Sequence, residues 1–169
     1  MNSKEYIKPS VYYKLDKTLR DKLSARLKVF CGVIIQEGDK ILLVKEAGHK
    51  YKGYDFPGGK LMWGENLLTC AVREVLEETG YRCKLTGIVG IYQKDVEMDD
   101  QDYLRFIFCA EKYGRKSTPK DITVTTVSWL KISKLHEPEM YRGLGVMQEI
   151  KDYLNGSRYP IDMIKLFKW

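Results

Sequence analysis

The sequence predicts an α/β fold in which helices pack over a mixed central sheet. Strand-like and helix-like segments follow one another in the order strand, strand, helix, three strands and helix. This order suits helices packed over a sheet. The length of 169 residues is enough for one domain with a substantial hydrophobic core, and no repeat or low-complexity segment interrupts the pattern.

The first element is a basic segment, residues 1–28, which we expect to extend a domain formed by residues 29–169. It holds eight Lys and Arg and three acidic residues, and so most of the net charge of +6. Leucine recurs at every fourth position from 15 to 27, which predicts a helix over 14–28. Such a stripe is typical of packing on the same domain or on a second copy in a homodimer, and less often of a separate binding arm.

Five strands and a terminal helix are predicted from the pattern of apolar residues. Alternating or continuous apolar runs indicate strands at 29–35, 40–44, 85–92, 103–110 and 122–130. Glu37-Gly38-Asp39 is a turn signal between the first two. Residues 143–154 are predicted to form the last helix, which ends before Asn155-Gly156.

The central helix carries the chemistry. It follows a Phe-Pro-Gly-Gly loop at 56–59, whose glycines expose backbone carbonyls. Its apolar residues recur at three- and four-residue spacing between 67 and 76, and Gly80 is placed to end it. Glu74, Glu77 and Glu78 share the opposite face.

Three carboxylates at this spacing repel one another unless a cation lies among them. Arg73 can hold one of them through a charge-assisted fork, and oxygen-rich sites suit Mg²⁺ or Mn²⁺. The alternative is a solvated acidic helix face, which most Glu-rich stretches are. The loop-then-helix context favours the metal site.

The spacing of these residues resembles the Nudix box, and about residues 29–155 resemble the Nudix hydrolase family. One departure is Tyr81, where the family has Ile, Leu or Val. The resemblance implies a Nudix fold, an α/β/α sandwich with a mixed central sheet and a catalytic loop–helix. The matching residues are Gly59, Glu65, Arg73, Glu74, Val75, Glu77, Glu78 and Gly80.

The resemblance also implies roles. Glu74, Glu78 and the carbonyl of Gly58 match direct metal ligands, and Glu77 matches a position that binds metal through water or assists the attacking water. Glu65 and Arg73 match a supporting pair. The implied activity is Mg²⁺-dependent hydrolysis of phosphate or diphosphate linkages in small nucleotides, with Mn²⁺ as a substitute.

Within the family, the strand 104–108 and the tail 158–164 resemble the bacterial NudJ group. That group implies phosphatase activity on nucleoside tri- and diphosphates and on the diphosphate of the thiamine pyrimidine. NudJ-like enzymes do not have the extension 1–28. The markers of ADP-ribose, diadenosine-polyphosphate and NADH hydrolases are missing.

Substrate contacts are predicted for three residues. Trp63 and Tyr92 can stack on a base, although core packing explains Tyr92 equally well. Arg105 lies among apolar residues, so it should reach either a carboxylate or a substrate phosphate. Asp121 or the acidic loop 95–102 can supply a further carboxylate to the site.

Two other functions stay open at this point: an RNA 5′-end pyrophosphohydrolase that uses residues 1–28, and a non-catalytic nucleotide-binding module. No apolar run reaches the roughly 18 residues that span a membrane, and the start lacks the apolar core of a secretion signal. We therefore expect a cytoplasmic protein. The four cysteines lack CxxC spacing, so we expect reduced thiols and no zinc site.

Overall fold

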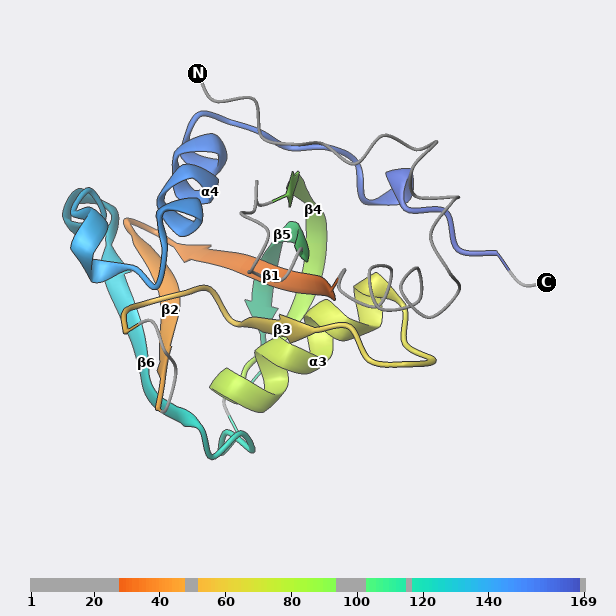
Figure 1. Ribbon diagram of the computed structural model, residues 1–169, viewed down its shortest axis with the longest axis horizontal. Helices are drawn as coiled ribbons and strands as arrows, with labels where there is room; N and C mark the ends of the chain where they lie inside the picture. Colours follow the sequence, from red (N-terminus) through yellow and green to blue (C-terminus); the bar gives the residue numbers. More distant parts are fainter. Residues whose placement is uncertain (1–27, 48–51, 94–102, 115–116, 168–169) are drawn as a thin grey trace, which may run out of the picture.

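In the part of the chain that the structure describes, a six-stranded mixed sheet carries one α-helix on each face (Figure 1). The computed structural model describes residues 28–47, 52–93, 103–114 and 117–167. The α/β sandwich predicted from the sequence is confirmed. The predicted helix over 14–28 lies outside the described residues except for Lys28, which begins a strand and does not end a helix, and the acidic loop 95–102 lies outside them entirely. The strands are β1 (Lys28–Glu37), β2 (Lys40–Glu46), β3 (Gly58–Lys60), β4 (Arg82–Gln93), β5 (Tyr103–Tyr113) and β6 (Val124–Lys131), and the helices are α3 (Leu67–Thr79) and α4 (Leu144–Leu154).

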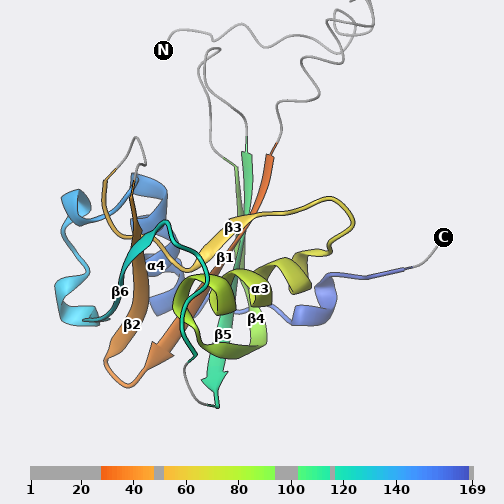
Figure 2. The same ribbon diagram turned by 90° about the horizontal axis from the view of Figure 1, so that it is seen from below.

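Strand β1 is the centre of the sheet, whose order is β4-β5-β1-β2-β6. It pairs in parallel with β5 and antiparallel with β2, while its first half also pairs with β3 (Figure 2). The segment predicted as a plain loop at 56–59 therefore ends in a short strand. Glycines carry no hydrophobic pattern, so this strand has no signal in the sequence.

The two faces of the sheet carry separate hydrophobic cores because alternate residues of each strand point to opposite faces. Val33 and Ile35 of β1 pack with Val75 of α3, whereas Ile34 between them packs with Ile150 of α4. Figure 1 shows the two helices on either side of the sheet. All four cysteines are buried and unpaired, as expected for reduced thiols.

Helix α3 is closed at both ends by its own sequence. Asn66 caps the start: Thr69 N donates to Asn66 Oδ1 at 2.9 Å, and Asn66 N donates to Thr69 Oγ1 at 3.2 Å. At the other end Gly80 adopts a left-handed conformation with φ of 74°, and its N–H donates to Leu76 O. Ser117 then donates from N and Oγ to the carbonyl of Gly80.

Replacement of Gly80 by alanine should destabilise the fold more than a left-handed conformation alone explains. A Cβ at Gly80 would run into the backbone of Ser117, with Ser117 C at 2.8 Å. Gly156 is the matched control, because it has φ of 93° and nothing within 4 Å of a Cβ. We expect Gly156→Ala to cost about 1–2 kcal/mol of unfolding free energy and Gly80→Ala about 1–3 kcal/mol more, measured by urea unfolding. Equal losses of unfolding free energy in the two variants would show that the backbone at Ser117 moves aside without a cost in stability.

Candidate active site

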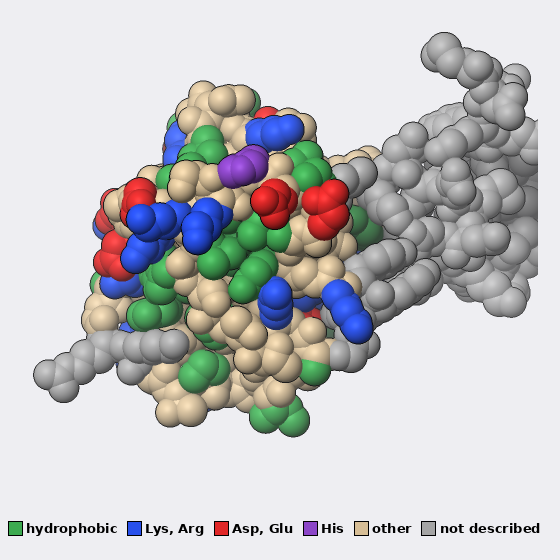
Figure 3. All heavy atoms as spheres, turned by 90° about the vertical axis from the view of Figure 1, so that its left-hand side faces the viewer, with side chains coloured by type: hydrophobic (Ala, Val, Ile, Leu, Met, Phe, Trp, Pro, Cys, Tyr) green, Lys and Arg blue, Asp and Glu red, His purple; other side chains and the backbone are tan. Residues whose placement is uncertain are grey.

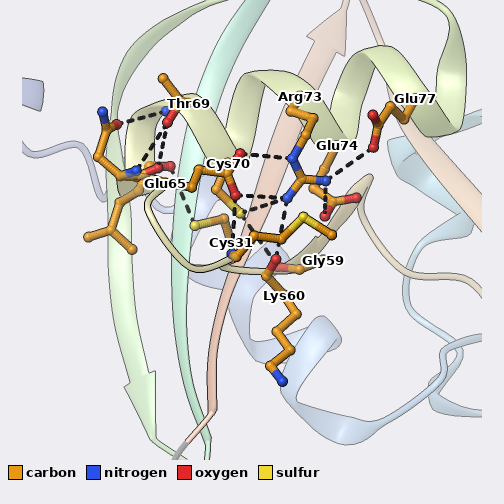
Figure 4. A network of polar contacts seen from close by, with 12 residues as sticks. Cys31, Gly59, Lys60, Glu65, Thr69, Cys70, Arg73, Glu74 and Glu77 are labelled. Carbon is orange, nitrogen blue, oxygen red and sulfur yellow. Dashed lines mark hydrogen bonds and ion pairs between the residues drawn. The ribbon is translucent and has the colours of Figure 1, made fainter.

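One guanidinium organises the acidic face of α3 (Figure 4). Arg73 donates from Nε and Nη2 to the two oxygens of Glu65, at 2.8 and 2.9 Å. Its Nη1 donates to Glu74 Oε1 at 2.7 Å and to Glu77 Oε2 at 3.1 Å. The arginine therefore holds three carboxylates, where the sequence predicted one. The two-pronged contact with Glu65 fixes the orientation of the guanidinium as well as its position.

The same arginine ties the helix to the strand in front of it. Its Nη2 donates to the carbonyl of Lys60, the last residue of β3, at 3.3 Å. The Oε2 of Glu65 that accepts from Arg73 also accepts from the N–H of Met62, at 3.2 Å. The hydrogen bonds from Arg73, acting against burial, hold the pKa of Glu65 below its usual range. Glu65 is thus a fixed, ionised partner of Arg73.

Glu74 and Glu78 lie against the two glycines of the loop that becomes β3. Glu78 is 3% exposed, and its Oε2 accepts from the N–H of Gly58 at 2.9 Å. Glu74 is 8% exposed, and a Cβ on Gly59 would lie 2.6 Å from its Cδ. In a strand the N–H and C=O of one residue leave on the same edge. The carbonyl of Gly58 is therefore directed to the side of Glu78.

These two carboxyl groups differ from Glu65 in their electrostatics. Burial raises the pKa of Glu78 to about 9, and the nearby carboxylates of Glu46, Glu74 and Asp55 add to that effect against the Gly58 hydrogen bond. Burial also raises the pKa of Glu74, although Arg73 opposes it. Negative charge is costly here without a further cation. A strongly shifted carboxyl in such surroundings is a sign of a functional site.

The donor set fits a divalent cation. Glu74, Glu78 and the carbonyl of Gly58 offer oxygen ligands, which Mg²⁺ and Mn²⁺ prefer, and Glu77 lies on the same helix with 40% of its side chain exposed. Among the described residues, no three acidic, His or Cys side chains are arranged to hold a metal ion by themselves. Arg73 binds Glu74 and Glu77 through one oxygen of each.

The residues predicted to contact the substrate lie in three different surroundings. Trp63 is fully exposed just before Glu65. Tyr92 is half-buried, and its hydroxyl donates to Asp152 Oδ2 of α4 at 2.9 Å. Arg105 reaches carboxylates, one of the two predicted alternatives: those of Asp55 and Glu149. The substrate roles of all three stay predictions.

Asp121, the other proposed carboxylate donor, is engaged in a turn. Its N–H donates to Glu77 O at 3.0 Å, and its Oδ1 accepts from Thr123 N at 2.8 Å. The backbone of Asp121 therefore lies close to α3, and its carboxylate is hydrogen-bonded within its own turn. Its role in the site stays a prediction.

Four charged residues were missed by the sequence reasoning: Asp55, Glu149, Arg142 and Glu46. Asp55 and Glu149 bind Arg105, and Arg142 Nη2 lies 2.8 Å from Glu46 Oε1. A signal for Glu149 was present, because it lies on the apolar face of α4 beside Val146 and Ile150. A carboxylate on such a face needs a partner.

The family follows from the fold, the site and the comparison with known proteins together. The family model described as the NUDIX domain matches residues 25–147. The chain belongs to the Nudix family and is a Nudix hydrolase, an enzyme that acts on phosphorus-containing anhydrides.

Individual relatives show which Nudix proteins the chain is similar to. The chain is 30% identical over 138 residues to Phosphatase NudJ of Escherichia coli K12, which covers 81% of this chain and 89% of that protein. A NUDIX hydrolase structure from Nitrosomonas europaea is 31% identical with a TM-score of 0.76, covering 83% of this chain and 97% of that one. A MutT protein from Bacillus halodurans, at 22% identity and a TM-score of 0.63, covers 78% and 85% and shares the fold.

These similarities confirm the predicted family, fold and enzyme class, and the resemblance to NudJ. They also argue against the alternative hypothesis of a non-catalytic nucleotide-binding module. Nudix enzymes generally use a divalent metal such as Mg²⁺. Within the part of the chain that the structure describes, no helix is both long and apolar enough to cross a membrane.

Proposed function

We propose that this Nudix hydrolase depends on Mg²⁺, with Mn²⁺ as a substitute, and cleaves phosphate or diphosphate linkages of small nucleotides. It would act as a phosphatase or pyrophosphatase on nucleoside tri- and diphosphates, with thiamine-pyrimidine diphosphate as a further candidate. The observation that carries the proposal is the buried pair Glu74 and Glu78 against Gly58 and Gly59. The similarity to Phosphatase NudJ supports the phosphatase activity.

In this proposal the residues divide the work. The Gly58 carbonyl, Glu74 and Glu78 would hold the cation directly, and Glu77 would bind it through water or accept the proton of the attacking water. Glu65 acts through Arg73, which orients the carboxylates. A bound divalent cation would neutralise the diphosphate and lower the pKa of a water molecule. The water oxygen bonds to phosphorus as the anhydride bond breaks, which releases orthophosphate or a nucleoside monophosphate.

Substrate recognition is assigned to Trp63 and Tyr92. Trp63 is fully exposed two residues before Glu65, so its ring is available for stacking on a base beside the proposed metal site. Tyr92 would act from the α4 side. RNA is the second candidate substrate, with residues 1–28 as the basic contact. On the face shown in Figure 3, acidic and basic side chains are interspersed, which does not favour a long polyanion there.

A substrate screen tests the proposal. Purified full-length protein is offered nucleoside tri- and diphosphates, nucleotide sugars, dinucleotides, thiamine-pyrimidine diphosphate and triphosphorylated RNA, with product identification. We expect turnover of a nucleoside tri- or diphosphate. Deletion of 1–28 should leave this turnover intact if the truncated protein folds. Activity on RNA alone, lost on that deletion, would replace the proposed substrate by RNA.

Cation binding should release protons. In the cation-free protein, burial raises the pKa of Glu78 to about 9, so this carboxyl is largely protonated at neutral pH. A metal ligand must be ionised, so binding expels the proton, and the affinity for Mn²⁺ should rise with pH up to about 9. Calorimetry at pH 7 in buffers of different ionisation enthalpy measures the number of protons released. A value of zero, or an affinity that falls with rising pH, would contradict Glu78 as a ligand.

A further inference from the structure

A buried ionic cluster lies behind the loop that carries Gly58, on the side of α4. Arg105 of β5 donates to both oxygens of Asp55, from Nη1 to Oδ2 at 3.1 Å and from Nη2 to Oδ1 at 2.9 Å. Its other edge faces Glu149 of α4, with Nε 3.0 Å from Oε1 and Nη2 3.1 Å from Oε2. We call these residues the Asp55–Arg105–Glu149 cluster. It joins a strand, a loop and a helix that are far apart in the sequence.

The cluster is closely packed and its carboxylates are buried. A Cβ on Gly32 of β1 would lie 2.9 Å from Ile107 Cδ1 and 3.5 Å from Arg105 Nη2, so the absence of a side chain there gives the guanidinium room. Both carboxylates are buried, and Glu149 is 1% exposed. Removal of one partner from a buried ion pair leaves an uncompensated charge.

The two carboxylates are held unequally. Asp55 has both terminal nitrogens of Arg105, and Arg142 Nη1 at 3.9 Å from its Oδ2. Against the effect of burial, these arginines hold the pKa of Asp55 below its usual range, whereas burial raises the pKa of Glu149. Asp55 thus faces two arginines, whereas Glu149 is paired with Arg105.

A short backbone segment, in which each residue takes part in a hydrogen bond, connects Asp55 to the proposed metal site. Its carboxylate Oδ1 also accepts from the N–H of Phe56 at 2.7 Å. Every residue from 55 to 58 is held by at least one hydrogen bond, and Gly58 is the last of them. The other bonds run from Asp55 N to Val44 O (3.0 Å), Val44 N to Asp55 O (2.9 Å), Val33 N to Pro57 O (2.9 Å) and Gly58 N to Glu78 Oε2 (2.9 Å).

We propose that Arg105 is a positioning residue: by holding Asp55 it sets the place of the Gly58 carbonyl relative to Glu78, and so the affinity of the site for a divalent cation. Because Arg105 also binds Glu149, the position of the Gly58 carbonyl depends in addition on α4, which packs on the face of the sheet opposite α3. The inference rests on the proposed metal site. It assigns Arg105 an effect on cation binding, and no contact with the substrate.

Arg105→Lys tests the inference, because lysine keeps the charge and lacks the fork. The dissociation constant for Mn²⁺ is measured on the full chain by electron paramagnetic resonance without substrate, and kcat and KM are measured at saturating Mn²⁺. We expect the dissociation constant to rise by about 10-fold or more, the usual effect of losing a residue that orients a ligand. KM at saturating Mn²⁺ should not change.

Two further variants keep the test decisive. Asp55→Asn removes the charge at the loop itself and should weaken Mn²⁺ binding similarly, which serves if Arg105→Lys does not fold. Glu37→Gln is the matched control, because Glu37 pairs with Lys112 at 3.0 Å, also between β1 and β5, on an exposed surface. It should bind Mn²⁺ as the wild type does.

The possible outcomes separate the alternatives. A lower melting temperature with an unchanged Mn²⁺ dissociation constant in both cluster variants would reduce the cluster to a structural role and overturn the inference. A raised KM with unchanged Mn²⁺ affinity would make Arg105 a substrate contact and overturn it as well. Failure of the wild type to bind Mn²⁺ would overturn the proposed metal site together with the inference.

Discussion

Glu78→Gln is expected to lower hydrolysis by at least about 10²-fold at saturating Mg²⁺, the scale of losing a group essential to metal or acid–base catalysis. The amide keeps the shape of the side chain, and its oxygen can still accept from the N–H of Gly58. It cannot supply the negative charge that a cation needs. Because burial raises the pKa of Glu78, the neutral amide should cost the cation-free protein no stability at pH 7.

Steady-state kinetics across a Mg²⁺ titration and a thermal melt check both parts of this prediction. Glu111→Gln is the control, since Glu111 is an exposed glutamate on β5 and should leave the rate unchanged. Near-normal turnover by Glu78→Gln at saturating Mg²⁺ would remove Glu78 from the ligands. A large loss of stability would instead show that its charge supports the fold.

Gly59→Ala should lower activity by about 10²-fold, the effect of displacing a catalytic group by about 1 Å. The added Cβ would lie 2.8 Å from Glu74 Oε2 and 2.6 Å from its Cδ. The atoms that must yield are the end of a side chain, so the fold should survive with a small change in melting temperature. The carboxylate that moves away is a proposed metal ligand, so the rate and the Mn²⁺ affinity should both fall.

Gly145→Ala is the matched control for this substitution. Gly145 lies in α4 with nothing within 4 Å of a Cβ, and alanine is the better helix former by about 1 kcal/mol. It should leave activity unchanged and raise stability slightly. Normal turnover and normal Mn²⁺ affinity in Gly59→Ala would show that Glu74 works equally well in another position.

The sequence was most informative where periodicity and spacing were strong. The apolar pattern around Val75 predicted α3. The resemblance to the Nudix box implied a pair of Glu65 and Arg73, and in the structure Arg73 Nε lies 2.8 Å from Glu65 Oε1. Strand β3 was missed because glycines have no apolar pattern. Its pairing with β1 depends on the close approach that a missing side chain allows, which is a property of the pair and not of either segment.

The ion-pair partners of residues far apart in the chain could not be predicted from the sequence, for a related reason. Arg105 was expected to need a negative partner because it lies mid-strand among apolar residues. The identity of that partner depends on which helix crosses which strand, so neither Asp55 nor Glu149 could be named. Arg73 likewise was expected to hold one carboxylate, and its three contacts depend on side-chain reach that only the folded helix defines.

The parallel pairing of β1 with β5 has a consequence for the order of events in folding. Lys28 pairs with Tyr103 and Ile35 with Ala110, so β2, β3, α3 and β4 all lie between the paired segments in the chain. Closing so long a loop is slow, because its entropy is lost before the contacts form. During synthesis, the residues from Gly59 to Gly80 leave the ribosome before β5, the strand that pairs in parallel with β1, has been made. We therefore expect competence to bind Mn²⁺ to appear late, only after β5 has joined the sheet.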